Sequence, residues 1–134
     1  MPPFPFSEPD LLERLHAASA DDIDTWPIGV VAFDATGVVR LYSRHESAFS
    51  GISRDRVMGR LWFDEVAQCM NNFLVAQRFV DARAEGSRLD TVLPYVLTLK
   101  MRPTPVRLRL LWAPGQDLAW VVLHRTAEAK GPLP

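Results

Sequence analysis

The chain has one cysteine, Cys69, and only three histidines, at positions 16, 45 and 124. A single cysteine cannot form an intramolecular disulfide, so the sequence excludes a disulfide-stapled secreted domain. The histidines are far apart along the chain and do not have the spacing of a zinc site with Cys69. We therefore expect no metal site.

Long apolar runs and an excess charge are also lacking. No run approaches the roughly 20 residues that a membrane-spanning helix needs, and the start, MPPFPFSEPD, has neither the basic nor the apolar region of a signal peptide. The 15 basic and 16 acidic residues give a net charge of −1, and the basic ones are scattered. A phosphate-binding surface is normally basic, so we expect a cytoplasmic protein with neither a membrane nor nucleic acid as its partner.

Motifs of the common enzyme classes are missing. There is no glycine-rich phosphate loop. A thiol enzyme needs a base beside its nucleophile, and the sequence signals none for Cys69. We therefore expect that the protein is not an enzyme.

What is present suits one compact domain. The chain has 134 residues, and 48% of them are apolar, which is enough to build a core. The sequence predicts a single domain over 1–134. Within it, we expect an N-terminal cap with a short helical stripe over 1–25, a core over 26–125 and a flexible tail over 126–134.

Apolar and β-branched segments predict five strands, with helices between the second and the third. A longer helix is expected to begin after Asn71 or Asn72 and to end at Gly86. The strands are expected at 27–34, 38–43, 91–99, 105–112 and 118–124.

Residue patterns also indicate where the strands lie in the sheet. Pro94 lacks a backbone donor and predicts an edge strand, whereas the continuously apolar segment 118–124 predicts a central one. Arg107 and Arg109 alternate with apolar residues, which predicts a strand with one face toward water. The fold class is therefore α+β, an antiparallel five-stranded sheet with helices on one face and an N-terminal helical cap.

This order of elements resembles a PAS fold, and its details resemble one branch of it, the photoactive yellow protein family, from about residue 28 to 125. The similarity lies in a first hairpin that ends in a tyrosine, a glycine and aromatic pair before a cysteine, and two late strands. These segments read GVVAFDATGVVRLYS, VMGRLWFDEVAQC, KMRPTPVRLRL and GQDLAWVVLHR.

The resemblance implies a chromophore site. The family attaches p-coumaric acid as a thioester to the matching cysteine, which is Cys69 here. Tyr42 and Glu46 would then hydrogen-bond the phenolate oxygen, and Ser50, where the family has threonine, would support Tyr42. The other residues that the resemblance places at or around the pocket are Val31, Ile52, Trp62, Val66, Ala67, Gln68, Tyr95, Leu97 and Met101.

The same resemblance implies a blue-light photoreceptor in which trans-to-cis isomerisation is followed by proton transfer from Glu46. A phenol has a pKa of about 10 in water, and burial raises it, so an ionised phenol in an apolar pocket needs strong donors. A buried glutamate beside a phenolate favours its protonated form and can be such a donor. In the family the N-terminal segment then comes away, and 1–25 is the equivalent segment here.

Two departures from the family pattern stand in this site: Ile52 replaces a pocket arginine, and Gln68 replaces the proline before the cysteine. The alternative hypothesis is a chromophore-free PAS module that senses a ligand or binds a protein, in which Cys69 only packs. The sequence does not identify the downstream signalling protein, through which we expect the output to pass. It also leaves open whether the chain forms a homodimer.

Overall fold

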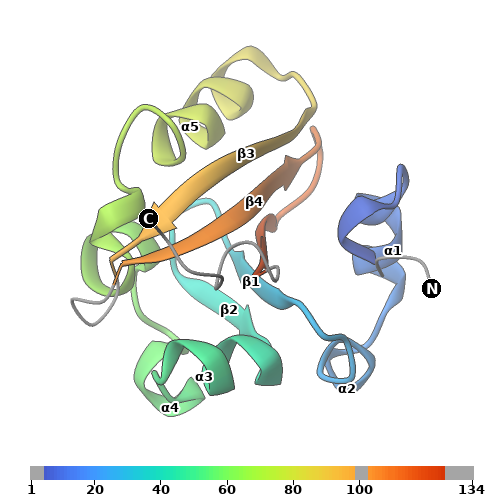
Figure 1. Ribbon diagram of the computed structural model, residues 1–134. Helices are drawn as coiled ribbons and strands as arrows, with labels where there is room; N and C mark the ends of the chain where they lie inside the picture. Colours follow the sequence, from blue (N-terminus) through green and yellow to red (C-terminus); the bar gives the residue numbers. More distant parts are fainter. Residues whose placement is uncertain (1–4, 99–102, 126–134) are drawn as a thin grey trace.

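The computed structural model describes residues 5–98 and 103–125 and contains one antiparallel sheet of five strands in the order β2-β1-β5-β4-β3 (Figure 1). This arrangement confirms the predicted α+β class. The strands are β1 (Gly29–Phe33), β2 (Val39–Tyr42), β3 (Leu89–Leu97), β4 (Thr104–Trp112) and β5 (Ala119–His124).

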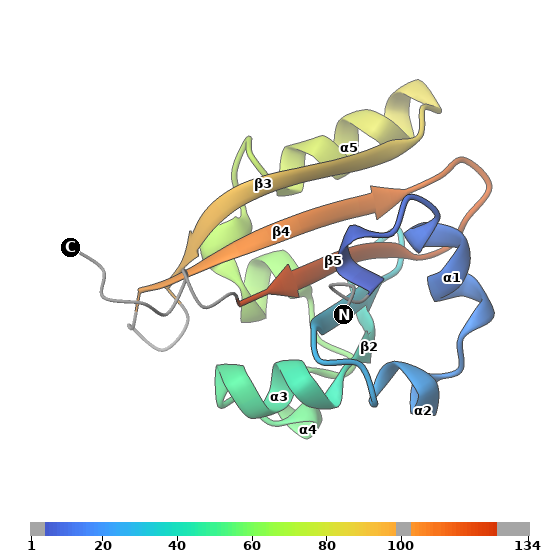
Figure 2. The same ribbon diagram turned by 45° about the vertical axis from the view of Figure 1, so that its right-hand side comes forward.

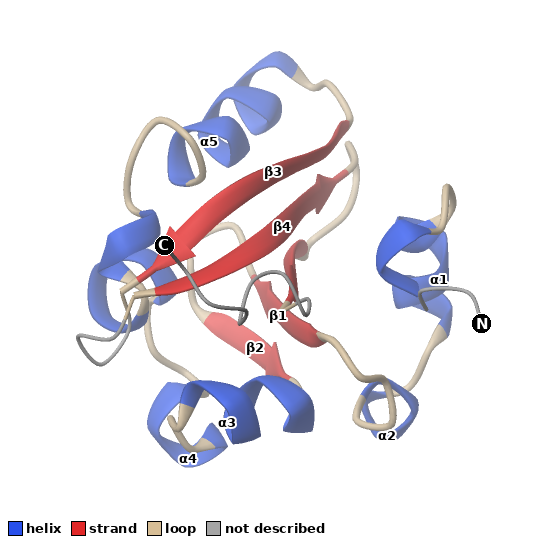
Figure 3. Cartoon of the chain, viewed as in Figure 1, coloured by secondary structure: helices blue, strands red, loops and turns tan. Residues whose placement is uncertain are grey.

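Helical segments cover both faces of this sheet, as the two views in Figures 1 and 2 show. Before the sheet lie η1 (Pro5–Ser7), α1 (Leu11–Ala17) and α2 (Ala20–Ile23). Between β2 and β3 lie α3 (Arg44–Ser50), α4 (Arg54–Val57), a π-helical turn η2 (Trp62–Val66), a 3₁₀ turn η3 (Gln68–Met70) and α5 (Ala76–Glu85). Figure 3 shows that this second group is joined by loops of varied length. No helix among the described residues is long and apolar enough to cross a membrane.

The strand positions agree with the sequence patterns. Pro94 lies in β3, which forms one edge of the sheet, and β5 lies at its centre with residues 119–123 fully buried. Gly86 ends α5 with a positive φ of 65°, as its position predicted. Leu99 and the predicted tail 126–134 lie outside the described residues.

The N-terminal segment builds a second core on the face of the sheet opposite α3–α5. Phe6, Leu11, Leu12, Leu15 and Ile23 are all buried at 3% exposure or less. They pack with side chains of the central strands, namely Val30, Ala32, Leu111, Trp120 and Val122. The cap therefore buries more apolar surface than the short stripe in its sequence indicated.

The prediction that Arg109 faces water is wrong, because the cap covers it. Its side chain is only 7% exposed and makes a two-point ion pair with Asp90, with Nε–Oδ1 and Nη2–Oδ2 distances of 2.8 and 2.9 Å. Its Nη1 also donates to the carbonyl oxygens of Phe6 (2.8 Å) and Glu8 (2.7 Å). Arg109 thus ties the N-terminal segment to the sheet. Arg107 is exposed, as predicted.

Candidate functional site

Tyr42 forms the polar end of the candidate site. It is the last residue of β2, is 2% exposed, and its hydroxyl is joined to Ser50 Oγ by a hydrogen bond of 2.7 Å. The Tyr42 ring lies 6.4 Å from the ring of Trp62. Burial raises the pKa of Tyr42 to about 12, although the Ser50 hydrogen bond opposes this rise. Tyr42 is therefore neutral at physiological pH, and its hydroxyl is held by Ser50.

Ser43 explains why α3 begins directly after Tyr42. Its Oγ accepts hydrogen bonds from the backbone N–H of Glu46 (3.3 Å) and of Val30 (2.9 Å), so one buried side chain caps the helix and anchors it to β1. Gly51, with a φ of 76°, ends α3 one residue after Ser50. These two ends position Glu46 and Ser50 on the sheet.

Glu46 is completely buried and faces β1 and the end of β5. A Cβ atom at Gly29 would overlap Glu46 Oε1, so the carboxyl group occupies the space that this glycine leaves open. Both carboxyl oxygens are bound by Arg125, with distances of 2.6 Å from Oε1 to Nη1 and 3.0 Å from Oε2 to Nη2. Burial raises the pKa of Glu46, and the Arg125 guanidinium opposes this rise.

Cys69 lies in η3, is partly exposed, and packs against the buried core. Its carbonyl oxygen accepts hydrogen bonds from Asn72 Nδ2 (3.0 Å) and from the hydroxyl of Tyr95. The Asn72 amide also donates to the Tyr95 oxygen at 2.6 Å. One nearby side chain, Asn72, and one from β3, Tyr95, therefore fix the backbone that carries the thiol.

Most of the predicted site residues converge on one core between the sheet and the helices. The fully buried members are Val31, Tyr42, Trp62, Ala67 and Leu97. The partly buried residues packed against them are Ile52, Val66, Cys69 and Tyr95. The structure thus places the thiol and the Tyr42 hydroxyl at one shared core, although they come from distant segments.

One polar atom in this core fits a bound molecule. Trp62 is fully buried, and its Nε1 has no hydrogen-bond partner within residues 5–98 and 103–125. A buried donor without a partner costs about 1–3 kcal/mol, so native structures rarely leave one unexplained. A ligand with acceptor oxygens, such as a hydroxycinnamoyl group, suits a core that holds this donor and Tyr42 and against which Cys69 packs.

The remaining predicted residues lie elsewhere. Gln68 is exposed, and its Nε2 donates to the Asp64 carbonyl oxygen at 2.7 Å, while Met101 lies outside the described residues. Arg54 does not supply the charge missing at Ile52. Its guanidinium donates instead to the Tyr42 carbonyl oxygen (2.9 Å) and to Asp24 Oδ1 of the cap (2.8 Å).

Sequence reasoning missed Gly29 and Arg125. A glycine at the start of an apolar strand can mark a close approach by another group, which was the only available signal for Gly29. Arg125 stands directly after the buried strand β5 and lies 79 residues from Glu46, so no local pattern joins the two.

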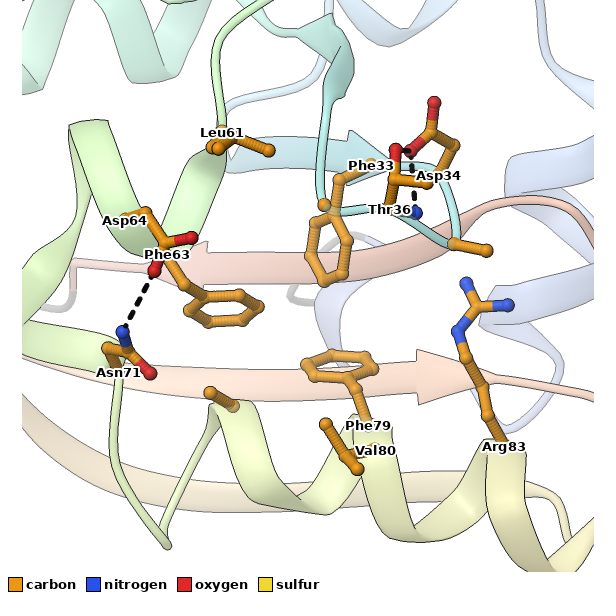
Figure 4. Close-up of a pocket in the computed structure, with 13 residues that line it drawn as sticks. Phe33, Asp34, Thr36, Leu61, Phe63, Asp64, Asn71, Phe79, Val80 and Arg83 are labelled. Atoms are coloured by element: carbon orange, nitrogen blue, oxygen red, sulfur yellow. Dashed lines mark hydrogen bonds between the residues drawn. The ribbon is translucent and has the colours of Figure 1, made fainter.

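A separate groove of about 250 Å³ opens beside α5 and the β1–β2 turn. Figure 4 shows the rings of Phe33, Phe63 and Phe79 converging on it, with Arg83 directed toward the turn at Asp34. The Phe33 ring lies 5.2 Å from Phe63 and 5.1 Å from Phe79, both in edge-on geometry. None of the predicted site residues lines this groove.

Comparison with known proteins agrees with the fold and with the family resemblance of the sequence. No family model matches the chain. The photoactive yellow protein of Halochromatium salexigens is 29% identical over 120 residues, which cover 90% of this chain and 95% of that protein. The photoactive yellow protein domain of the sensor histidine kinase Ppr from Rhodospirillum centenum superposes with a TM-score of 0.75 at 32% identity, over 84% of this chain and 97% of that one. A PAS domain of an HTR-like protein from Haloarcula marismortui gives 0.62 at 15% identity, over 86% and 96% of the two chains, and so shares the fold.

Proposed function

Because this chain belongs to the photoactive yellow protein family, we propose that it is a blue-light photoreceptor that carries p-coumaric acid as a thioester on Cys69. The observation that carries this proposal is the convergence of Tyr42 and Cys69 on one buried core. The Tyr42 hydroxyl is paired with that of Ser50, and the only cysteine of the chain packs against the same core.

Each side chain has a role in this proposal. When bound, the p-coumaroyl group absorbs visible light and isomerises from trans to cis. Tyr42 donates a hydrogen bond to the phenolate oxygen, and Ser50 holds the Tyr42 hydroxyl in place. Glu46 holds a proton before light and releases it afterwards. Tyr95 and Asn72 keep the Cys69 backbone in position.

Reconstitution tests the covalent step. The unloaded protein is mixed with the anhydride of p-coumaric acid, so that the Cys69 sulfur bonds to a carbonyl carbon while p-coumarate and the thiol proton leave. We expect the intact mass to rise by one p-coumaroyl group and a visible band to appear that blue light bleaches reversibly. The matched control is Cys69→Ala, which should stay colourless and keep its mass. Labelling of the Ala variant, or a band that light does not change, would overturn the proposal.

A chromophore-free sensing module is the second candidate, and the aromatic groove at Phe63 favours it. Under this alternative reconstitution gives no visible band that light bleaches reversibly, and a bound small molecule slows amide hydrogen exchange around the groove. A protein that is labelled on Cys69 and bleaches in light excludes this candidate as the main function.

The output remains a proposal as well. The matching domain in Rhodospirillum centenum belongs to a sensor histidine kinase, and we propose that this chain likewise acts on a signalling protein and is not itself an enzyme. Homodimerisation and a cytoplasmic location stay predictions from the sequence.

A further inference from the structure

The ion pair of Glu46 and Arg125 has no part in the light chemistry proposed above. Its two contacts, of 2.6 and 3.0 Å, join both carboxyl oxygens to two different guanidinium nitrogens. The Glu46 side chain is fully buried, and the Arg125 side chain is 10% exposed. This fork-to-fork geometry is the strongest arrangement that an arginine and a carboxylate form.

Such a pair requires the ionised form of Glu46. A guanidinium has only donors, so each carboxyl oxygen that faces it must be an acceptor. The proton donor of the proposed photoreceptor must instead be a neutral carboxylic acid whose hydroxyl points at a ligand. Glu46 cannot serve as that proton donor while Arg125 holds both of its oxygens.

We propose that Arg125 is the counter-ion of Glu46 and competes with the chromophore for this side chain. The inference rests on the proposed function for its light-driven half only. In the unloaded protein, Arg125 keeps Glu46 ionised. In the loaded protein, Glu46 is protonated in the dark, and after light its proton goes to the phenolate oxygen while the electron pair stays on the carboxylate. Arg125 then pairs with that carboxylate and stabilises the lit state.

Within residues 5–98 and 103–125, three other titratable groups lie near the pair, namely Tyr42, His45 and His124. The Tyr42 pKa is raised to about 12 by burial, and burial and the nearby charge of Arg125 lower the pKa of His45, so both are neutral at pH 7. A guanidinium, unlike these two groups, keeps its charge at physiological pH, so Arg125 supplies positive charge to Glu46.

Arg125 also connects the site to the cap. It directly follows His124, the last residue of β5, whose ring lies 5.1 Å from the ring of Phe6. Phe6 is a buried member of the second core. A change in the position of Arg125 would therefore act on the N-terminal segment through this neighbouring contact.

The first test uses unloaded protein and needs no chromophore. Infrared difference spectra against Glu46→Gln show whether Glu46 carries a proton at pH 7. We expect no protonated-carboxyl band in the wild type and a clear one in Arg125→Gln, in which burial alone acts on Glu46. Arg107→Gln, which removes an exposed arginine from the neighbouring strand, is the matched control and should resemble the wild type. A protonated Glu46 in the wild type would overturn the proposal.

The second test measures dark recovery of the loaded protein after a flash. Removal of the counter-ion destabilises the lit state, so Arg125→Gln should recover at least about tenfold faster than the wild type, which corresponds to 1.4 kcal/mol. Arg125→Lys keeps the charge without the fork and should lie between the two, which also guards against a Gln variant that folds poorly. Equal recovery rates in the wild type and both Arg125 variants would overturn the proposal that Arg125 stabilises the lit state. A protein that takes up no chromophore contradicts the proposed function instead, and the infrared test still decides the pair.

Discussion

Gly29 on β1 and Glu46 on α3 occupy one space: a Cβ atom on the glycine would overlap the carboxyl oxygen of the glutamate. The absence of a side chain at Gly29 in β1 therefore leaves room for the carboxyl group of Glu46 from α3. Glu46 has no exposed surface, so its carboxyl group lies entirely inside the protein.

Gly29→Ala should consequently destabilise the protein by about 1–3 kcal/mol, the usual cost of inserting a methyl group into a well-packed core. The midpoint of urea unfolding measures this loss. The same change in a Glu46→Ala background is the control, and there it should cost much less because the overlapping carboxyl is gone. An equal loss in both backgrounds would show that Glu46 is not the obstacle.

Arg109→Gln should weaken the attachment of the N-terminal segment. The variant loses a two-point ion pair with Asp90 and two hydrogen bonds to the Phe6 and Glu8 carbonyl oxygens. Removing one partner of a buried pair costs about 3–5 kcal/mol, and the partial exposure of Asp90 places the expected loss at the low end, about 3 kcal/mol. Urea unfolding and limited proteolysis near residue 8 measure the two effects. Arg107→Gln should leave both unchanged, and equal cleavage in the two variants would refute the attachment.

Stability should fall with rising pH because of Glu46. Its pKa is raised in the folded protein above the ordinary value of 4.5, chiefly by burial, although Arg125 opposes the rise. Between pH 4.5 and the pKa of Glu46 in the folded protein, the folded state binds more protons than the unfolded state. The contribution of Glu46 is therefore complete below pH 4.5 and is lost as the pH rises through the folded pKa.

Glu46→Gln cannot titrate at this position and should lack that decline. The measurement is the free energy of unfolding of both proteins in urea from pH 4 to pH 8. Parallel curves over this range would contradict a raised pKa for Glu46.

Ile52 should make the chromophore phenolate of the loaded protein easier to protonate. Ile52 is partly buried against the site core and carries no charge, so it cannot stabilise a nearby anion. Acid titration of the visible band measures this effect, and Ile52→Arg should shift the midpoint to lower pH. A wild-type midpoint below that of the variant would contradict the prediction.

The sequence predicted the positions of strands in the sheet better than it predicted how the N-terminal cap packs on the sheet. Pro94 and the apolar run of β5 identified the edge and the centre because a missing donor and two-sided burial act locally. Arg109 was assigned to a wet face because its alternation is that of a half-exposed strand, and only the tertiary structure shows the cap above it. Period-two patterning records the direction of a side chain but not what lies there.

The site was predicted in the same uneven way. Family resemblance supplied Tyr42, Ser50 and Cys69. The structure places Tyr42 and Cys69 at one core and pairs Ser50 with the Tyr42 hydroxyl. The sequence contained no indication of the Arg125 pair. An ion pair between residues 79 positions apart produces no pattern in the sequence around either residue. Charges that act over long sequence separations require coordinates.

The Arg109 attachment also affects how the chain folds. The carbonyl groups that it binds belong to residues 6 and 8, which are synthesised about a hundred residues before it. During translation the N-terminal segment therefore has no anchor of this kind until β4 has been made. Contacts between residues so far apart in sequence form late, because closing the long loop between them has a high entropic cost. The first part of the protein to be made is thus expected to be among the last to reach its native position.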